Sequence, residues 1–182
     1  MVAARTLVLG GARSGKSAHA EGLIARADPV TYVATARRDP DDAEWAERIA
    51  AHVARRPAHW RTAEAPAPEQ LPAVLTGADP AESVLVDDIA TWLTGLLDDT
   101  GAWDRDPAAL QRTREHRERL AEATRRCGSR LVLVSAEVGL GIVPSTRSGR
   151  LFRDELGALN AQLAEECDEV VLLVAGVALQ LR

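Results

Sequence analysis

Short apolar runs alternate along the chain with longer segments in which apolar and polar residues are mixed. The runs are rich in Val and Leu and predict strands over Thr6–Leu9, Val30–Thr35, Ser83–Ile89, Arg130–Val138 and, on either side of a bend at Gly176, twice within residues 169–181. Because most of these runs are continuously apolar, we expect the strands to be covered on both faces, as in a parallel sheet.

The mixed segments carry helix signals. One helix is expected from Lys16 to about Ala27, and another between the Asp106–Pro107 cap and a stop at Gly128. A third helix is expected from apolar residues at three- and four-residue spacing, namely Phe152, Leu156, Leu159 and Leu163.

Strands and helices therefore alternate, which predicts an α/β fold with a mostly parallel sheet flanked by helices. A chain of 182 residues is long enough for one core, so we expect a single domain over residues 1–182. Ala65–Ala73 (APAPEQLPA) is the only stretch that resembles a linker, and it is too short to divide domains.

Composition and charge narrow the class of partner. Hydrophobic residues make up 46% and charged residues 27%, as in ordinary globular proteins. The net charge of -5 argues against nucleic acid as a partner, because nucleic acid needs a basic surface. No apolar run is long enough for membrane insertion. Two cysteines, Cys127 and Cys167, fit reduced thiols in the cytoplasm better than a disulfide framework.

One glycine-rich segment carries a specific chemical signal. It fits the pattern G-x-x-x-x-G-K-[ST] and lies between a predicted strand and a predicted helix, as a phosphate-binding loop requires. Its residues are Gly10, Gly11, Ala12, Arg13, Ser14, Gly15, Lys16 and Ser17. Lys16 is the only lysine of the chain, and the other basic residues counted with it are arginines. A lysine reaches the β- and γ-phosphates as a compact charge, whereas the planar guanidinium is larger and less adaptable there.

An acidic partner for this loop is expected at the end of the run SVLVDD. Asp87 follows the apolar residues there, where phosphate-loop enzymes place a carboxylate for Mg²⁺, and we expect it to act opposite the Ser17 hydroxyl. The neighbouring Asp88 is more simply explained as the cap of the following helix.

A second candidate site lies in residues 41–64. Trp45, Ile49 and Val53 recur at four-residue steps and predict an amphipathic helix. His52 lies off that apolar stripe among arginines, which attract phosphate and favour a neutral, nucleophilic imidazole. Three arginines share its neighbourhood on a helix: Arg48, Arg55 and Arg56.

Spacing alone leaves alternatives to this assignment open. A histidine on an arginine-rich helix is usually only solvated, and His59 is a rival nucleophile. His116 is expected on a solvated face of its charged helix, and His19 is expected to pack beside the phosphate loop rather than to react.

Taken together, these motifs resemble the bifunctional adenosylcobinamide kinase / adenosylcobinamide-phosphate guanylyltransferase family of cobalamin biosynthesis. The resemblance rests on the order and spacing of GGARSGKS, RPAHWRTAE and EVGLGIVP and extends to the carboxyl terminus. It implies a P-loop NTPase-like, RecA-like fold. It also implies phosphorylation of the aminopropanol hydroxyl of adenosylcobinamide by ATP or GTP, followed by transfer of GMP from GTP to that phosphate, with Mg²⁺.

The resemblance further assigns roles to individual residues. It places the nucleophile of a covalent guanylyl-histidine at His52, and it gives Lys16 a catalytic role at the phosphate loop. Nucleotide contacts are implied for Gly10 to Ser17, Ala34, Thr35, Ala36, Val53, Ala54, Arg55, Arg56, Glu64 and Asp87. A homo-oligomer, with a trimer as one form, is implied as well.

Two positions depart from the pattern expected of this family, in which asparagines often stand where this chain has Gly95 and Ala136. The departures leave open which of the two activities dominates. Glu137, at the end of a predicted strand, is a candidate for substrate contact, and a carboxylate that only faces water is an equal alternative.

Rival functions differ in what they require. A Ras-like switch needs N-K-x-D, which a chain with Lys16 as its only lysine and Asn160 as its only asparagine cannot contain. A monofunctional small-molecule kinase with the same fold remains the main alternative, and it predicts no covalent nucleotide on His52. A binding module without catalysis is a third possibility.

Overall fold

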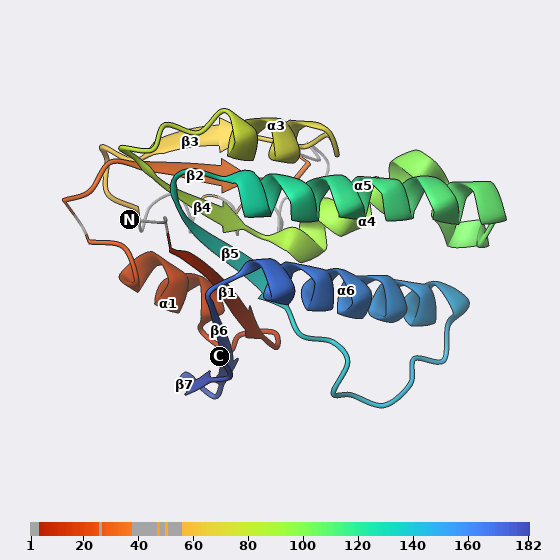
Figure 1. Cartoon of the computed structure of the whole chain (residues 1–182). Coiled ribbons are helices and arrows are strands. Elements are labelled where there is room, and N and C mark those ends of the chain that lie inside the picture. Colours follow the sequence, from red (N-terminus) through yellow and green to blue (C-terminus); the bar gives the residue numbers. More distant parts are fainter. Residues whose placement is uncertain (1–3, 26, 38–46, 48–49, 51–55) are drawn as a thin grey trace.

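The computed structural model describes residues 4–25, 27–37, 47, 50 and 56–182. Within them seven strands form one sheet in the order β3-β2-β4-β5-β1-β6-β7 (Figure 1). Neighbouring strands are parallel, except for the antiparallel pair β6–β7. The strands are β1 Arg5–Gly10, β2 Val30–Ala34, β3 Arg61–Glu64, β4 Ser83–Asp87, β5 Arg130–Ala136, β6 Glu169–Val174 and β7 Val177–Gln180. The expected mostly parallel α/β sheet is thereby confirmed.

Helices follow most of the strands. They are α1 Lys16–Gly22, α3 Gln70–Thr76, α4 Ile89–Thr100, the 3-10 helix η1 Ala102–Asp104, α5 Pro107–Arg126 and α6 Arg147–Glu166. None of the helices in the described residues combines the length and apolarity needed to cross a membrane. The predicted start of α5 is confirmed, because Asp106 accepts a hydrogen bond from the Ala109 backbone N–H at 2.9 Å with Pro107 in the first turn.

Three local expectations need correction. Helix α1 ends at Gly22 instead of near Ala27, because the chain turns there, buries Ile24 and returns to β2. The linker-like stretch Ala65–Ala73 contains the start of α3, whose Leu71 and Leu75 are buried in the core. Strand β3 was not predicted, since its short sequence RTAE is mostly exposed at the edge of the sheet and has no apolar run.

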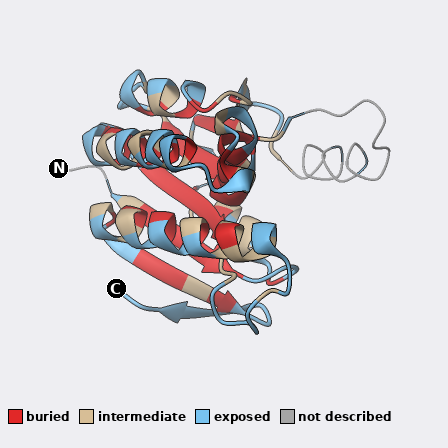
Figure 2. Cartoon of the chain, turned by 90° about the vertical axis from the view of Figure 1, so that its right-hand side faces the viewer, coloured by how far each residue is buried: buried red, intermediate tan, exposed pale blue. Residues whose placement is uncertain are grey.

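Apolar side chains of the strands alternate between two cores, one on each face of the sheet. The larger core includes Leu7 and Leu133 and packs against α3, α4, α5 and α6. The smaller core includes Val8 and Val132 and packs against α1. Figure 2 shows the resulting buried centre of the sheet between more exposed helices. Strands buried on both faces explain why the runs are continuously apolar.

The parallel register brings the carboxyl ends of the strands to one edge. Ala34 pairs with both Glu64 and Asp87 on its two neighbours, and Gly10 pairs with Ala136. Strand β5 lies between β1 and β4. Residues from distant parts of the sequence therefore meet at this edge, where α/β sheets bind ligands.

Candidate active site

The phosphate-binding loop connects β1 to α1 at the carboxyl edge. Gly10 is required by close packing, because a Cβ there would collide with the Ser14 side chain and lie 3.1 Å from the Leu173 carbonyl oxygen. Gly15 has φ +90°, a conformation that glycine adopts most easily, and it leads directly into Lys16 at the start of the helix. The Lys16 Nζ lies 3.3 Å from the Gly11 carbonyl oxygen, so the ammonium group folds over the loop.

Asp87 faces the loop from the end of β4. Its Oδ1 accepts a hydrogen bond from the Ser17 Oγ at 3.3 Å, and its Oδ2 accepts one from the Tyr32 hydroxyl at 2.7 Å. The Arg56 guanidinium lies over the Tyr32 ring, 3.2 Å from its centroid. Burial, followed by the charge of Asp87, raises the pKa of the Tyr32 phenol. The phenol therefore stays protonated and donates to Asp87.

The Ser17 hydroxyl and the Asp87 carboxylate fit Mg²⁺ by the chemistry of their donors. Mg²⁺ prefers hard oxygen ligands and binds through one or two protein groups together with phosphates and water. Ser17 and Asp87 supply such oxygens beside a loop shaped for phosphate.

Asp88 has the capping role expected for it. Its Oδ1 accepts a hydrogen bond from the Thr91 backbone N–H at 2.7 Å, and its carbonyl oxygen accepts one from the Thr35 hydroxyl at 2.7 Å. Burial raises the pKa of the Asp88 carboxyl, and the hydrogen bond from Thr91 opposes that shift. These bonds hold the start of α4 against the end of β2.

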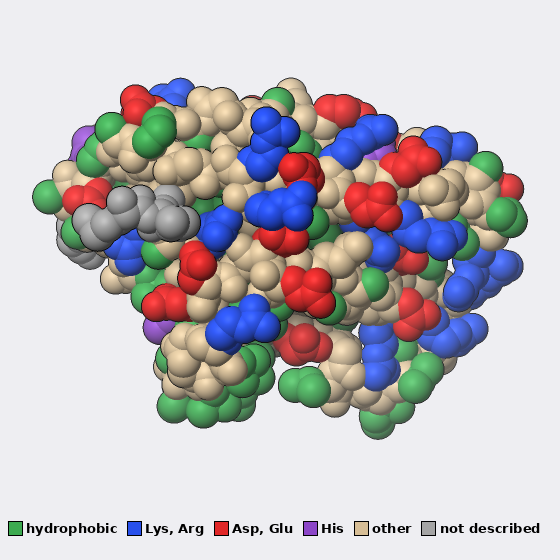
Figure 3. Space-filling model, in the orientation of Figure 1, with side chains coloured by type: hydrophobic (Ala, Val, Ile, Leu, Met, Phe, Trp, Pro, Cys, Tyr) green, Lys and Arg blue, Asp and Glu red, His purple; other side chains and the backbone are tan. Residues whose placement is uncertain are grey.

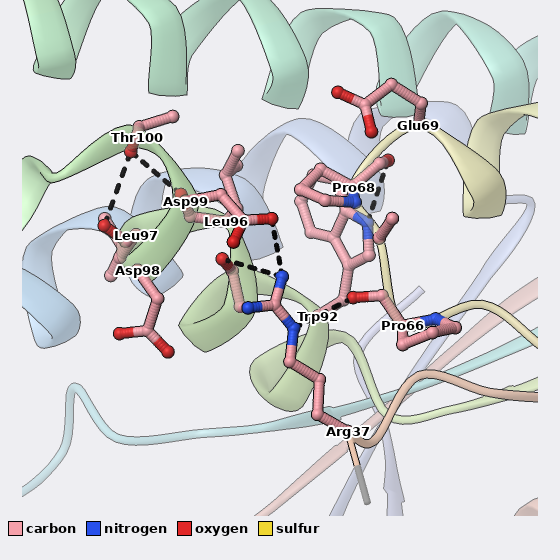
Figure 4. A network of polar contacts seen from close by, with 12 residues as sticks. Arg37, Pro66, Pro68, Glu69, Trp92, Leu96, Leu97, Asp98, Asp99 and Thr100 are labelled. Atoms are coloured by element: carbon pink, nitrogen blue, oxygen red, sulfur yellow. Dashed lines mark hydrogen bonds and ion pairs between the residues drawn. The ribbon is translucent and has the colours of Figure 1, made fainter.

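Arg37 fixes the segment that follows β2 (Figure 4). Its Nε donates to the Pro66 carbonyl oxygen at 3.1 Å, and its Nη2 lies 2.5 Å from the Asp99 Oδ2 and 3.4 Å from the Gly95 carbonyl oxygen. The hydrogen bond with Asp99 raises the pKa of Arg37. Residues 34–36, which immediately precede Arg37, are thus tied to α4 and to the segment after β3.

The structure shows what surrounds Gly95 and Ala136, the two positions where asparagine was expected. A Cβ at Gly95 would lie 3.2 Å from the Arg37 Nε, so the guanidinium occupies the space that a larger side chain would need. At the other position, the Ala136 carbonyl oxygen accepts a hydrogen bond from the buried Asn160 Nδ2 at 3.0 Å, and Asn160 in turn accepts one from Ser135 at 2.6 Å. Arg37 therefore fills the space beside Gly95, and Asn160 holds the backbone at Ala136.

Glu137 follows β5 directly beside the phosphate loop. Its backbone N–H donates to the Gly10 carbonyl oxygen at 3.1 Å, and its Oε1 accepts a hydrogen bond from the Gly139 N–H at 2.5 Å. The side chain is half-buried. The carboxylate thus supports the following turn and does not simply face water.

The described residues include three of the four histidines, and these three lie in different parts of the molecule. The His59 Nε2 lies 3.2 Å from the carbonyl oxygen of Asp28, which precedes β2. This imidazole therefore lies at the amino ends of the strands, whereas the phosphate-binding loop lies at their carboxyl ends. His116 lies on α5 with its Nε2 3.8 Å from a Glu69 carboxylate oxygen, and it is less solvated than expected. His19 lies on α1, three residues after Lys16. The rival His59 is therefore far from the phosphate loop.

Several predicted site residues lie outside the described residues, namely His52, Val53, Ala54 and Arg55. The other predicted residues gather at the carboxyl edge: the phosphate loop, residues 34–36, Glu64 and Asp87 at the strand ends, and Arg56 through its contact with Tyr32. Tyr32 and Arg37 were not predicted. The only signal for Tyr32 is that the single tyrosine of the chain interrupts an apolar strand.

A parallel sheet with a phosphate loop after β1 and a carboxylate at the end of β4 defines the P-loop NTPase class. A solved ATPase of the type III secretion system of pathogenic bacteria has this fold, with a TM-score of 0.55 at 13% identity over 94% of this chain. The alignment spans 51% of that longer chain, so the likeness concerns the fold alone. Within this class, the chain belongs to the cobinamide kinase / cobinamide phosphate guanyltransferase family, whose model matches residues 6–181.

Curated relatives agree with this family over nearly the whole chain. The bifunctional adenosylcobalamin biosynthesis protein CobU of Salmonella typhimurium is 44% identical over 97% of this chain and 98% of its own length. The bifunctional adenosylcobalamin biosynthesis protein CobP of Pseudomonas aeruginosa is 44% identical over 98% of this chain and 97% of its own length.

Proposed function

We propose that the protein carries out both reactions of its family, phosphorylating adenosylcobinamide and then transferring GMP to the product, at one phosphate-binding loop. The observation that carries the proposal is the meeting of the loop, Ser17 and Asp87 at the carboxyl edge of a sheet whose family match runs over residues 6–181. The sequence offers one such loop. A single site must therefore hold the triphosphate in both steps.

In the kinase step, the aminopropanol hydroxyl of adenosylcobinamide attacks the γ-phosphorus of ATP or GTP. The bond from the γ-phosphorus to the bridging oxygen breaks, the nucleoside diphosphate leaves, and the hydroxyl proton is released. Lys16 and the backbone N–H groups of the loop neutralise the charge that develops on the phosphate oxygens.

In the guanylyl step, an imidazole nitrogen of His52 attacks the α-phosphorus of GTP, and pyrophosphate leaves. Lys16 and the loop then stabilise the leaving group. A phosphate oxygen of adenosylcobinamide phosphate next attacks the α-phosphorus, the phosphorus–nitrogen bond breaks, and adenosylcobinamide-GDP forms. The place of His59 at the opposite edge of the sheet favours His52 as the nucleophile.

Mg²⁺, held by Ser17 and Asp87, would supply charge neutralisation at the β- and γ-phosphates. Further nucleotide contacts come from residues 34–36, from Val53 to Arg56 and from Glu64. The fixed position of residues 34–36 beside Arg37 and the pairing of Ala34 with Glu64 support these contacts.

Labelling with GTP tests the guanylyl step. The protein is incubated with Mg²⁺ and GTP labelled at the α-phosphate, denatured, and mapped by mass spectrometry. We expect GMP on His52 in a bond that survives alkali and is lost in acid, and His52→Ala should abolish the label while His59→Ala retains it. Label on His59 would contradict the assigned nucleophile, and GTP binding without any adduct would favour the monofunctional kinase.

Lys16→Ala tests whether one loop serves both steps. Because the same ammonium group contacts the triphosphate in each, we expect phosphorylation of adenosylcobinamide and labelling by GTP both to fall by about 100-fold or more. Each activity is measured separately with the same preparation, and circular dichroism verifies the fold. Survival of either activity would refute a shared site.

We also propose that the protein forms a homo-oligomer, with a trimer as the form to test, and works in the cytoplasm. Exposed apolar side chains on the edge strand β7, Val177 and Leu179, support self-association. The free, buried Cys127 and Cys167 are compatible with a reducing compartment. Sedimentation or light scattering that gives a stable monomer at micromolar concentration would contradict the oligomer.

A further inference from the structure

The segment between β5 and α6, residues 137–146, has an unusual surface. Three of its side chains are apolar and strongly exposed: Leu140 by 81%, Ile142 by 97% and Val143 by 65%. Apolar side chains gathered on one exposed segment often mark a binding surface. We refer to residues 137–146 as the apolar loop.

Polar contacts fix the backbone of the apolar loop at both ends. The Gly139 N–H donates to Glu137, and the Gly139 carbonyl oxygen accepts a hydrogen bond from the Arg153 Nη2 at 2.6 Å. At the other end, the Arg150 Nη1 donates to the Pro144 and Ser145 carbonyl oxygens at 2.9 and 2.8 Å. The exposed apolar side chains are thus presented on an anchored backbone.

The apolar loop starts next to the phosphate-binding loop. It begins at Glu137, whose N–H donates to the Gly10 carbonyl oxygen at 3.1 Å. On the other side, the turn between β6 and β7 contacts the same loop, because the Gly176 N–H donates to the Ser14 carbonyl oxygen at 3.2 Å. Figure 3 shows hydrophobic side chains gathered over both segments along the lower rim of this face, with a notch between them.

We propose that the apolar loop binds the corrin ring of adenosylcobinamide, an inference that rests on the function proposed above. The reacting hydroxyl sits on a short arm, so the macrocycle must lie beside the phosphate loop when the hydroxyl reaches the γ-phosphate. The ring is far larger than the arm and carries methyl groups that need apolar contacts, while its amide arms remain in water. Leu140, Ile142 and Val143 offer such contacts on the segment that starts beside the phosphate loop.

The substitution Ile142→Ser tests this proposal in an assay with adenosylcobinamide. Because Ile142 is almost fully exposed, its replacement should leave the fold intact. We expect the KM for adenosylcobinamide to rise by roughly tenfold, as expected for losing the burial of one large aliphatic side chain, with kcat within about twofold. The triple variant L140S/I142S/V143S should raise it further.

Two internal controls separate the outcomes. Labelling by GTP needs no corrinoid, so its rate should not change in Ile142→Ser. Leu181→Ser makes a comparable change at a residue that is 59% exposed, and it should leave the KM unchanged. The Leu181 N–H bonds to the carbonyl oxygen of Val170, near the start of β6, so Leu181 lies at the opposite edge of the sheet from the phosphate loop.

An unchanged KM in the triple variant would overturn the proposal. The proposal would also be overturned if the KM rose only in variants whose molecular mass by light scattering is smaller than that of the wild-type protein. The loop would then be an interface with a second copy of the chain. If the wild-type protein itself neither phosphorylates adenosylcobinamide nor takes up GMP, the proposed function fails instead.

Discussion

At the scale of single residues, the site depends on Asp87 having an oriented carboxylate. Tyr32 and Ser17 each donate to a different oxygen of Asp87, so rotation of the carboxylate would break at least one hydrogen bond. Tyr32 is itself held between the smaller core and the Arg56 guanidinium. A single tyrosine thus connects the packing of the sheet to the phosphate site.

Tyr32→Phe should lower the free energy of unfolding by about 1 kcal/mol near pH 8, because one buried hydrogen bond is lost. The pKa of Tyr32 is raised in the folded protein, so below pH 10, about the unfolded value, its contribution is complete. Above that pH the unfolded phenol ionises and the contribution falls. Urea unfolding of both proteins from pH 8 to 10.5 should therefore give converging stabilities, and parallel curves would contradict this account.

At the scale of elements, local capping decides where the long helices begin. Asp106 caps α5 and Thr146 caps α6, each through a side-chain oxygen that accepts a backbone N–H three residues later. The Asp106 cap was predicted from nearby residues alone, because its hydrogen bond spans a single turn. The Thr146 cap is of the same local kind but was not predicted. Because Thr146 caps α6, it also marks the end of the apolar loop.

Asp106→Ala should lower the free energy of unfolding by about 1 kcal/mol, because the Ala109 N–H loses its partner in the first turn of α5. Asp106→Asn is the matched control, since its amide oxygen can still accept that bond, and it should retain most of the stability. Chemical denaturation measures both. Equal losses in the two variants would indicate that Asp106 acts through its charge rather than through the cap.

At the scale of the whole molecule, α5 and α6 are joined through a largely buried ion pair. The Arg117 Nη1 donates to the Glu155 Oε2 at 2.7 Å, and the two side chains are only 9% and 17% exposed. Both helices contribute buried side chains to the larger core, so the pair links two elements that cover the same face of the sheet. Its removal should weaken the packing of the larger core.

Arg117→Ala should lower the free energy of unfolding by about 3 kcal/mol, because the Glu155 carboxylate, only 17% exposed, is left without its partner. Arg125→Ala is the control: Arg125 pairs with Glu122 on the exposed side of the same helix, and its loss should cost about 1 kcal/mol or less. Urea denaturation compares the two. Similar losses would show that burial does not set the strength of the Arg117 pair.

The sequence by itself determined the elements whose signals are local. The phosphate loop, the start of α5 and the apolar strands follow from residues within a few positions of one another, where turn geometry, capping and periodicity act. The same reasoning missed β3 and placed the end of α1 too late. Those features depend on what the chain meets next, since β3 is stabilised by pairing with β2 and α1 ends where Ile24 enters the smaller core.

Only the tertiary structure decided which distant residues meet. Strand order cannot be obtained from local patterns, because pairing depends on contacts between remote segments. That order brings Tyr32 under Arg56 and sends His59 to the amino ends of the strands, neither of which was predicted. The contact between Asp87 and Ser17 was expected, but only from the phosphate-loop pattern and not from any local signal that joins the two residues. The strand order also leaves the apolar loop exposed beside the phosphate loop. The sequence alone does not show whether a hydrophobic residue packs in the core or faces a ligand.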